Sequence, residues 1–160
     1  MAKQHDHKTN AMRVLDAAGV PYEYRMFETD GALSGVEVAR KLGLDEDQVF
    51  KTLVTQAKSG EHYVFMIPVA EELDLKKAAR AVGEKSIAML KSKELFPLTG
   101  YVHGGCSPIG MKKQFATTVD ETAQLFDRII FSGGKIGCQL EVAPDDLARV
   151  VPLSYTDLTV

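Results

Sequence analysis

Apolar residues alternate with polar ones, or recur every three to four positions, along most of the chain. The first pattern is typical of short strands and the second of short helices. Strands are expected at residues 22–27, 49–55, 62–69, 86–90, 115–119, 128–131 and 139–142, and helices at 10–18, 34–42, 75–82, 92–96, 120–126 and 144–150. Because these elements follow one another irregularly, the pattern favours an α+β domain with about seven short strands in one curved, mixed, barrel-like sheet.

Length and composition predict one folded domain. The 160 residues allow a single domain at 10–160 after a polar, flexible tail at 1–9. His5 and His7 in that tail could form a metal pair, but no further ligand is near them in sequence. No apolar run approaches the ~20 residues of a membrane span, and no apolar signal core opens the chain, so we expect a cytoplasmic protein that has no membrane partner.

The charges are unevenly distributed. The net charge is -3, yet residues 76–113 hold eight basic and two acidic side chains. Such a basic segment on an acidic protein can attract a polyanion to one face. The alternative interpretation is an ordinary solvated helix face and loop.

Lys51 stands in the middle of the expected strand at 49–55, on the face that also carries Val49 and Leu53. An unpaired ammonium is costly to bury. Two interpretations remain: the long stem reaches solvent at the rim of the sheet, or this face opens onto a polar cleft that holds a ligand.

Two glycine-rich turns, at 104–110 and 132–137, would let backbone N–H groups approach a ligand closely. Neither has the spacing of a known phosphate-binding loop, and each alone is typical of a tight turn. Finding both in one small domain favours a shared cleft. Cys106, with His103 three residues away, is a candidate nucleophile, or alternatively a small apolar filler. The spacing of Cys106 and Cys138 indicates neither a disulfide framework nor a zinc site.

Four segments in this order, at residues 49–54, 74–77, 100–110 and 132–137, resemble the YbaK proteins, which are free-standing relatives of the editing insertion domain of bacterial prolyl-tRNA synthetase. The resemblance spans residues 10 to about 153. It implies a YbaK-type fold and a trans-acting deacylase that hydrolyses Cys-tRNA(Pro). It also implies that the enzyme needs no metal or cofactor, acts on the 3′ end of tRNA(Pro), and has prolyl-tRNA synthetase as a possible partner.

The resemblance also implies roles for single residues. Lys51 matches the residue essential in that family, and Gly104 and Ser132 match residues that line its aminoacyl pocket. The expected substrate-binding set is Phe27, Thr52, Gly104, Gly105, Ser132, Gly133 and Gly134. Phe27 and Gln139 replace a tyrosine and an aspartate of the well-known member, which leaves the preferred amino acid open.

A cysteinyl ester carries its own thiol beside its own carbonyl, so such an enzyme needs no protein nucleophile. It must hold the thiol in an attacking pose and stabilise the oxyanion, for which the N–H groups of Gly104 or Gly105 are candidates. Lys51 would position the 3′ end of the tRNA. Two alternatives remain: a deacylase for another mischarged tRNA, such as Ala-tRNA(Pro), and a non-catalytic module that binds tRNA or its aminoacyl group.

Overall fold

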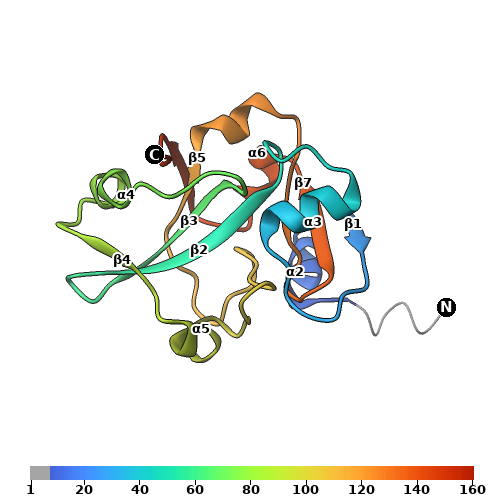
Figure 1. Cartoon of the computed structure of the whole chain (residues 1–160), viewed down its shortest axis with the longest axis horizontal. Helices are drawn as coiled ribbons and strands as arrows, with labels where there is room; N and C mark the ends of the chain where they lie inside the picture. The colour runs from blue at the N-terminus through green and yellow to red at the C-terminus, as the bar shows by residue number, and fades with distance from the viewer. Residues whose placement is uncertain (1–7) are drawn as a thin grey trace.

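The computed structural model describes residues 8–160, in which eight strands form two sheets (Figure 1). The larger sheet has the order β4-β2-β3-β5-β8 and the smaller one the order β1-β7-β6. The strands are β1 Glu23–Met26, β2 Phe50–Ala57, β3 His62–Pro68, β4 Ile87–Met89, β5 Thr117–Asp120, β6 Ile129–Ser132, β7 Cys138–Val142 and β8 Leu153–Thr156. Seven of these strands were predicted, and β8 was not.

The β2–β3 hairpin is the centre of the larger sheet. Its antiparallel register runs from Phe50 opposite Pro68 to Gln56 opposite His62. The turn between the strands contains Gly60, whose φ of 95° lies in the left-handed region that favours glycine. On the far side of β3, β5 and β8 are added in parallel, so the sheet as a whole is mixed, as predicted.

The prediction of one barrel-like sheet was wrong, because the strands divide into two sheets and close no barrel within residues 8–160. The sheets meet at a single parallel bridge between Val49 and Ile130, where the Ile130 N–H donates to the Gln48 carbonyl at 3.0 Å. Beyond this bridge the two strands separate: β2 pairs with β3, and β6 pairs with β7. Residues 51–53 of β2 therefore have no strand partner on the edge away from β3 in the described chain.

Five α-helices and one 3₁₀ helix complete the described chain. They are α2 Asn10–Ala18, α3 Gly35–Leu42, α4 Leu75–Val82, α5 Ser92–Thr99, η1 Glu121–Leu125 and α6 Pro144–Leu147. The predicted capping box at the start of α3 is present: Ser34 and Glu37 exchange hydrogen bonds between side chain and backbone. The segment expected as a helix at 120–126 winds as a 3₁₀ helix capped by Asp120.

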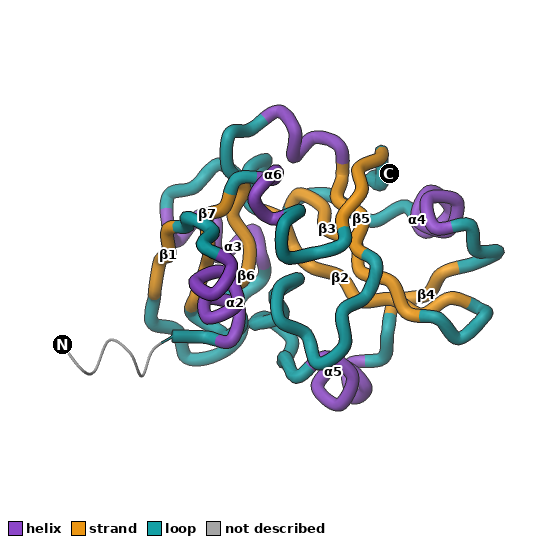
Figure 2. Tube along the Cα trace, turned by 180° about the vertical axis from the view of Figure 1, so that it is seen from behind, coloured by secondary structure: helices purple, strands orange, loops and turns teal. Residues whose placement is uncertain are grey.

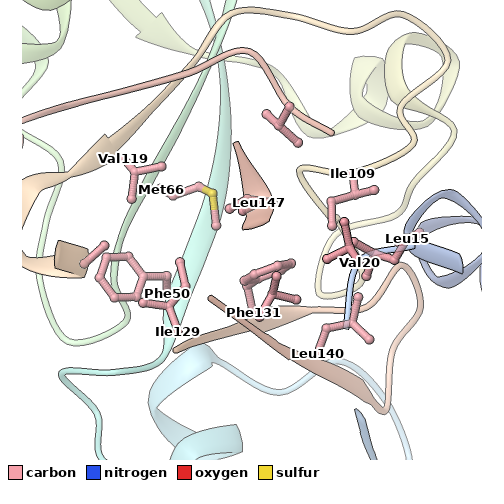
Figure 3. Close-up of a cluster of buried hydrophobic side chains, with 14 of the residues drawn as sticks. Leu15, Val20, Phe50, Met66, Ile109, Val119, Ile129, Phe131, Leu140 and Leu147 are labelled. Atoms are coloured by element: carbon pink, nitrogen blue, oxygen red, sulfur yellow. The ribbon is translucent and has the colours of Figure 1, made fainter. Parts of the chain in front are cut away.

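The main hydrophobic core lies between the two sheets. Figure 3 shows Leu15 of α2, Phe50 of β2, Met66 of β3, Phe131 of β6 and Leu140 of β7 directed into it, and all five are buried. The tube view from behind shows the same arrangement of strands and helices (Figure 2). This core fixes the start of β2 relative to β6 and β7, three of the strands that border the cavity described below.

The predictions for the N-terminal tail fall mostly outside the described residues. Nothing is described for 1–7, which include His5 and His7, whereas Thr9 is buried and its side chain caps α2. From residue 8 onward, no group of three or more His, Cys, Asp or Glu side chains is placed to hold a metal ion. No helix in this part of the chain has both the length and the apolar character to span a membrane.

Candidate active site

A cavity of about 400 Å³ opens where β2 separates from β6. Its wall is assembled from segments that are distant in sequence: the start of α3, the first half of β2, the end of β4 with α5, the loop after α5, and the facing ends of β6 and β7. The unpaired edge of β2 forms one side of this cavity. Consecutive residues 49–54 therefore all contribute to the wall, rather than every second residue.

Lys51 is half-buried on the cavity wall. Of the two interpretations of its place in the strand, the structure supports the one in which the strand opens onto a cleft. Burial lowers the pKa of Lys51, and the negative charges of Glu72 and Glu71 partly oppose that shift. The ammonium therefore lies in a partly desolvated site, where interactions with an anionic or carbonyl group are stronger than at an exposed surface.

Thr52 contributes the second polar side chain of β2 to the cavity. Its hydroxyl oxygen is buried and has no hydrogen-bond partner within residues 8–160. Buried hydroxyls are nearly always hydrogen-bonded, because an unmade bond costs about 1–3 kcal/mol. Thr52 therefore has an unused donor and acceptor next to Lys51 in the strand, although its oxygen is covered in this conformation.

The two glycine-rich turns meet at the cavity, as their presence in one small domain predicted. Gly104 and Ser132 both lie on the wall. A Cβ on Gly105 would stand 2.8 Å from the Ile136 nitrogen and 2.9 Å from two backbone atoms of Lys135, so only glycine permits this approach of the turns. The Gly105 N–H already donates to the Val102 carbonyl at 3.0 Å, which leaves Gly104 as the candidate oxyanion donor of the pair.

Four residues of the expected substrate-binding set are not on the wall: Phe27, Gly105, Gly133 and Gly134. Phe27 follows β1 and its N–H donates to the Gly137 carbonyl at 2.9 Å. Gly133 is packed so closely that a Cβ would stand 2.4 Å from the Cys138 sulfur, and Gly134 lies beside Tyr101. These positions shape the turn behind the cavity, whereas Lys51, Thr52, Gly104 and Ser132 face it.

Neither thiol is activated as a nucleophile. Cys106 lies on the cavity wall, but burial raises its pKa to about 12. Burial likewise raises the pKa of Cys138 to about 11. Both thiols are protonated near neutral pH, and the thiolate is the reactive form. The structure thus favours the filler interpretation of Cys106.

Sequence reasoning missed other parts of the wall. Ser34 and Gly35 bring the start of α3 to the cavity, and Gly35 lies against Val69, since a Cβ there would stand 2.4 Å from the Val69 Cγ1. Ser92 and Leu95 contribute one face of α5. The capping box marked where α3 begins, but no local pattern indicated that these helices border the same space as Lys51.

Comparisons with known proteins identify the family of the chain. Residues 29–150 match the family model described as an aminoacyl-tRNA editing domain. A protein of Enterococcus faecalis with the provisional name Cys-tRNA(Pro)/Cys-tRNA(Cys) deacylase EbsC is 45% identical over 158 residues, which cover 98% of this chain and 96% of that protein. The prolyl-tRNA editing protein ProX of Acetoanaerobium sticklandii is 26% identical over 156 residues, covering 96% of this chain and 88% of its own.

Among solved structures, one described provisionally as a trans-editing enzyme for prolyl-tRNA synthetase superposes with a TM-score of 0.83. Its sequence is 24% identical, and the match covers 94% of this chain and 95% of that one. At this identity, the superposition shows a shared fold and nothing further. The family match over most of the chain and the 45% identity to the E. faecalis protein confirm the resemblance read from the sequence: the chain belongs to the aminoacyl-tRNA editing domain family of YbaK type.

Proposed function

We propose that this protein is a trans-editing hydrolase that removes cysteine from mischarged Cys-tRNA(Pro). The observation that carries the proposal is the cavity of about 400 Å³, in which the partly desolvated Lys51 lies close to two glycine turns but neither cysteine is activated. The name of the E. faecalis relative supports the same substrate. A site of this kind suits an ester whose own side chain supplies the nucleophile.

The reaction proceeds in two steps. The substrate thiol attacks its own ester carbonyl, so that a carbon–sulfur bond forms, the carbon–oxygen bond to the ribose breaks, and the thiol proton passes to the departing ribose oxygen. Water then opens the strained thiolactone to free cysteine. The protein accelerates the first step by holding the thiol near the carbonyl and by stabilising the oxyanion that forms.

Three residues have defined tasks in this proposal. Lys51 grips the terminal ribose or its phosphate and so positions the 3′ end of the tRNA. The N–H of Gly104 is directed at the developing oxyanion, since the N–H of Gly105 is already used. Thr52, whose buried hydroxyl lacks a partner in the described chain, hydrogen-bonds the aminoacyl group after its side chain rotates toward the cavity.

Gln139 is the reason to consider Ala-tRNA(Pro) as a second substrate. It is 7% exposed, lies on the cavity wall, and is paired with Ser132 across β6 and β7. A neutral amide at this position meets a substrate differently from the aspartate that the resemblance leads one to expect. Alanine brings no thiol, so hydrolysis of Ala-tRNA(Pro) would need a water positioned by this wall instead.

The proposed partner is tRNA(Pro), with prolyl-tRNA synthetase as a further candidate. One relative is named a prolyl-tRNA editing protein, and the solved neighbour is described as acting for the synthetase. Selectivity for the tRNA body would then come either from this chain or from the synthetase. Deacylation with and without the synthetase separates these two sources.

The decisive experiment offers the purified protein proline tRNA charged with cysteine, alanine or serine. We expect rapid loss of cysteine, slow loss of alanine and serine, and at least a hundredfold decrease with Lys51→Met, which keeps the apolar stem but removes the charge. Lys58→Met, at an exposed position after β2, is the matched control and should behave as wild type.

Three outcomes would contradict the proposal. Equal rates for Lys51→Met and wild type would remove Lys51 from the mechanism. Faster release of alanine than of cysteine would replace substrate-thiol assistance with water attack. Salt-sensitive tRNA binding without any ester cleavage would favour a non-catalytic module. Cys106→Ala is a further control and should keep its activity. If this variant were inactive, the protein thiol would again be the candidate nucleophile.

A further inference from the structure

The basic segment recognised in the sequence divides into two separate groups in space. One group is on or next to α4 and contains Lys76, Lys77, Arg80 and Lys85. The other is on α5 and in the loop before β5 and contains Lys91, Lys93, Lys112 and Lys113. Figures 1 and 2 both show α4 and α5 apart, with β4 between them. Only the second group adjoins the cavity.

Helix α5 connects this second group to the cavity. Ser92 and Leu95 lie on the cavity wall. Lys91 is the N-cap of the same helix, and Lys93 is the residue after Ser92. Positive charge therefore begins at the rim of the cavity and continues along α5.

Lys112 extends the positive charge to the other end of α5. Its Cγ would stand 3.3 Å from a Cβ placed on Gly100, and its Nζ donates to the Pro97 carbonyl at 3.5 Å. The same Nζ lies 5.4 Å from the centre of the Phe96 ring, which is 56% exposed. The exposed ring of Phe96 thus lies beside the ammonium of Lys112, which is hydrogen-bonded to the backbone.

Lys93 borders a second hollow, and Lys113 is connected to it through the rings of Phe115 and His62. The Lys113 Nζ is 5.9 Å from the ring centre of Phe115, and that ring is 5.6 Å from the ring of His62. His62, Lys93 and Pro97 border an open hollow of about 460 Å³ next to α5. The four lysines are therefore arranged around one helix rather than scattered.

These lysines are not neutralised. Within residues 8–160, none of the four forms an ion pair, while one of the four α4 residues does, since Lys77 is 2.7 Å from Asp157. Glu94 is the one acidic residue between Lys91 and Phe115. Charges left unpaired along a helix attract a polyanion more strongly than paired ones.

We propose that Lys91, Lys93, Phe96, Lys112 and Lys113, here called the α5 surface, receive the single-stranded 3′ end of the RNA substrate and guide it into the cavity. The proposal rests on the proposed function. Lysines would neutralise successive phosphates, and a base would stack on Phe96, the combination by which proteins bind single-stranded nucleic acid. A protein partner is disfavoured, because lysine is depleted in protein interfaces.

The test compares two double variants that remove the same charge from different surfaces. Lys112→Gln/Lys113→Gln changes the α5 surface, and Lys76→Gln/Arg80→Gln changes exposed residues of α4. Each is assayed, without any synthetase, on Cys-tRNA(Pro) and on the small ester cysteinyl-adenosine at several salt concentrations. We expect the first variant to raise KM for the tRNA about tenfold at low salt and to lower the salt slope by about 1.4–1.8, with the small ester unaffected.

Each outcome bears on a different claim. The α4 variant should match wild type on both substrates, and Lys112→Arg/Lys113→Arg should restore binding. If wild type cleaves neither ester, the proposed function fails. If wild type cleaves both but the α5 and α4 variants behave alike, or the α5 variant slows the small ester equally, the α5 surface is not an RNA site. An effect seen only when a synthetase is added would assign this surface to a protein partner instead.

Discussion

Gly105→Ala tests whether the two glycine turns support the cavity by direct backbone contact. The added Cβ would stand 2.8–2.9 Å from backbone atoms of Lys135 and Ile136, and backbone atoms cannot rotate away as a side-chain end can. The turn at 135–136 must therefore shift by a few tenths of an ångström. Overpacking of this kind costs about 2 kcal/mol. For a chain of this size, that corresponds to a decrease in Tm of about 4–8 °C.

The same shift should reduce catalysis, because Gly104 and Ser132 lie on the wall beside the displaced turns. We expect at least a tenfold decrease in deacylation of Cys-tRNA(Pro), since small misplacements of positioning groups have large effects on rate. Thermal denaturation followed by circular dichroism gives Tm, and the deacylation assay is run well below it, where the variant is folded.

Gly31→Ala is the matched control, because no atom lies within 4 Å of a Cβ placed there and its φ is not in the left-handed region. It should leave Tm within ~2 °C of wild type and deacylation unchanged. If Gly105→Ala also has the Tm and the deacylation rate of wild type, the two turns are not in direct contact and this description of the cavity wall is wrong.

Two further variants probe the polar groups of β2. Glu71→Gln/Glu72→Gln removes the carboxylates that raise the pKa of Lys51, so the pKa of Lys51 should decrease further. The pH above which enzymatic deacylation declines should then be lower than in wild type, after correction for uncatalysed hydrolysis. An unmoved decline would show that Lys51 is not the titrating group. Thr52→Val removes a buried hydroxyl that lacks a partner in the described chain, so it should stabilise the fold by about 1 kcal/mol while raising KM; a lower Tm would contradict this.

The sequence predicted most of the elements because their signals are local. Alternation located β2 and β3, the capping box located α3, and the glycines at 19, 43, 83 and 100 end four helices in the left-handed conformation. Strand β8 was missed, because it is four residues long, none of them is buried, and it is held only by its parallel pairing with β5. No local turn signal announces such a pair.

The site was predicted in part for the same reason. Lys51 drew notice as a charge within an apolar strand, and the glycine turns as unusual local composition. Sequence could not show that Gly105 has its N–H committed to Val102 or that the start of α3 reaches the cavity. Those facts depend on tertiary contacts, which local spacing does not encode.

The site exists because the two sheets of the described chain do not close into the expected barrel. A closed barrel would pair β2 with β6 along their whole length and cover the edge at residues 51–53. Instead the strands share one bridge at Val49 and Ile130 and then diverge, so Lys51 and Thr52 border an opening rather than a neighbouring strand. The core around Phe50 and Phe131 holds the two strands together just before they part. The cavity therefore occupies the space where β2 and β6 do not pair.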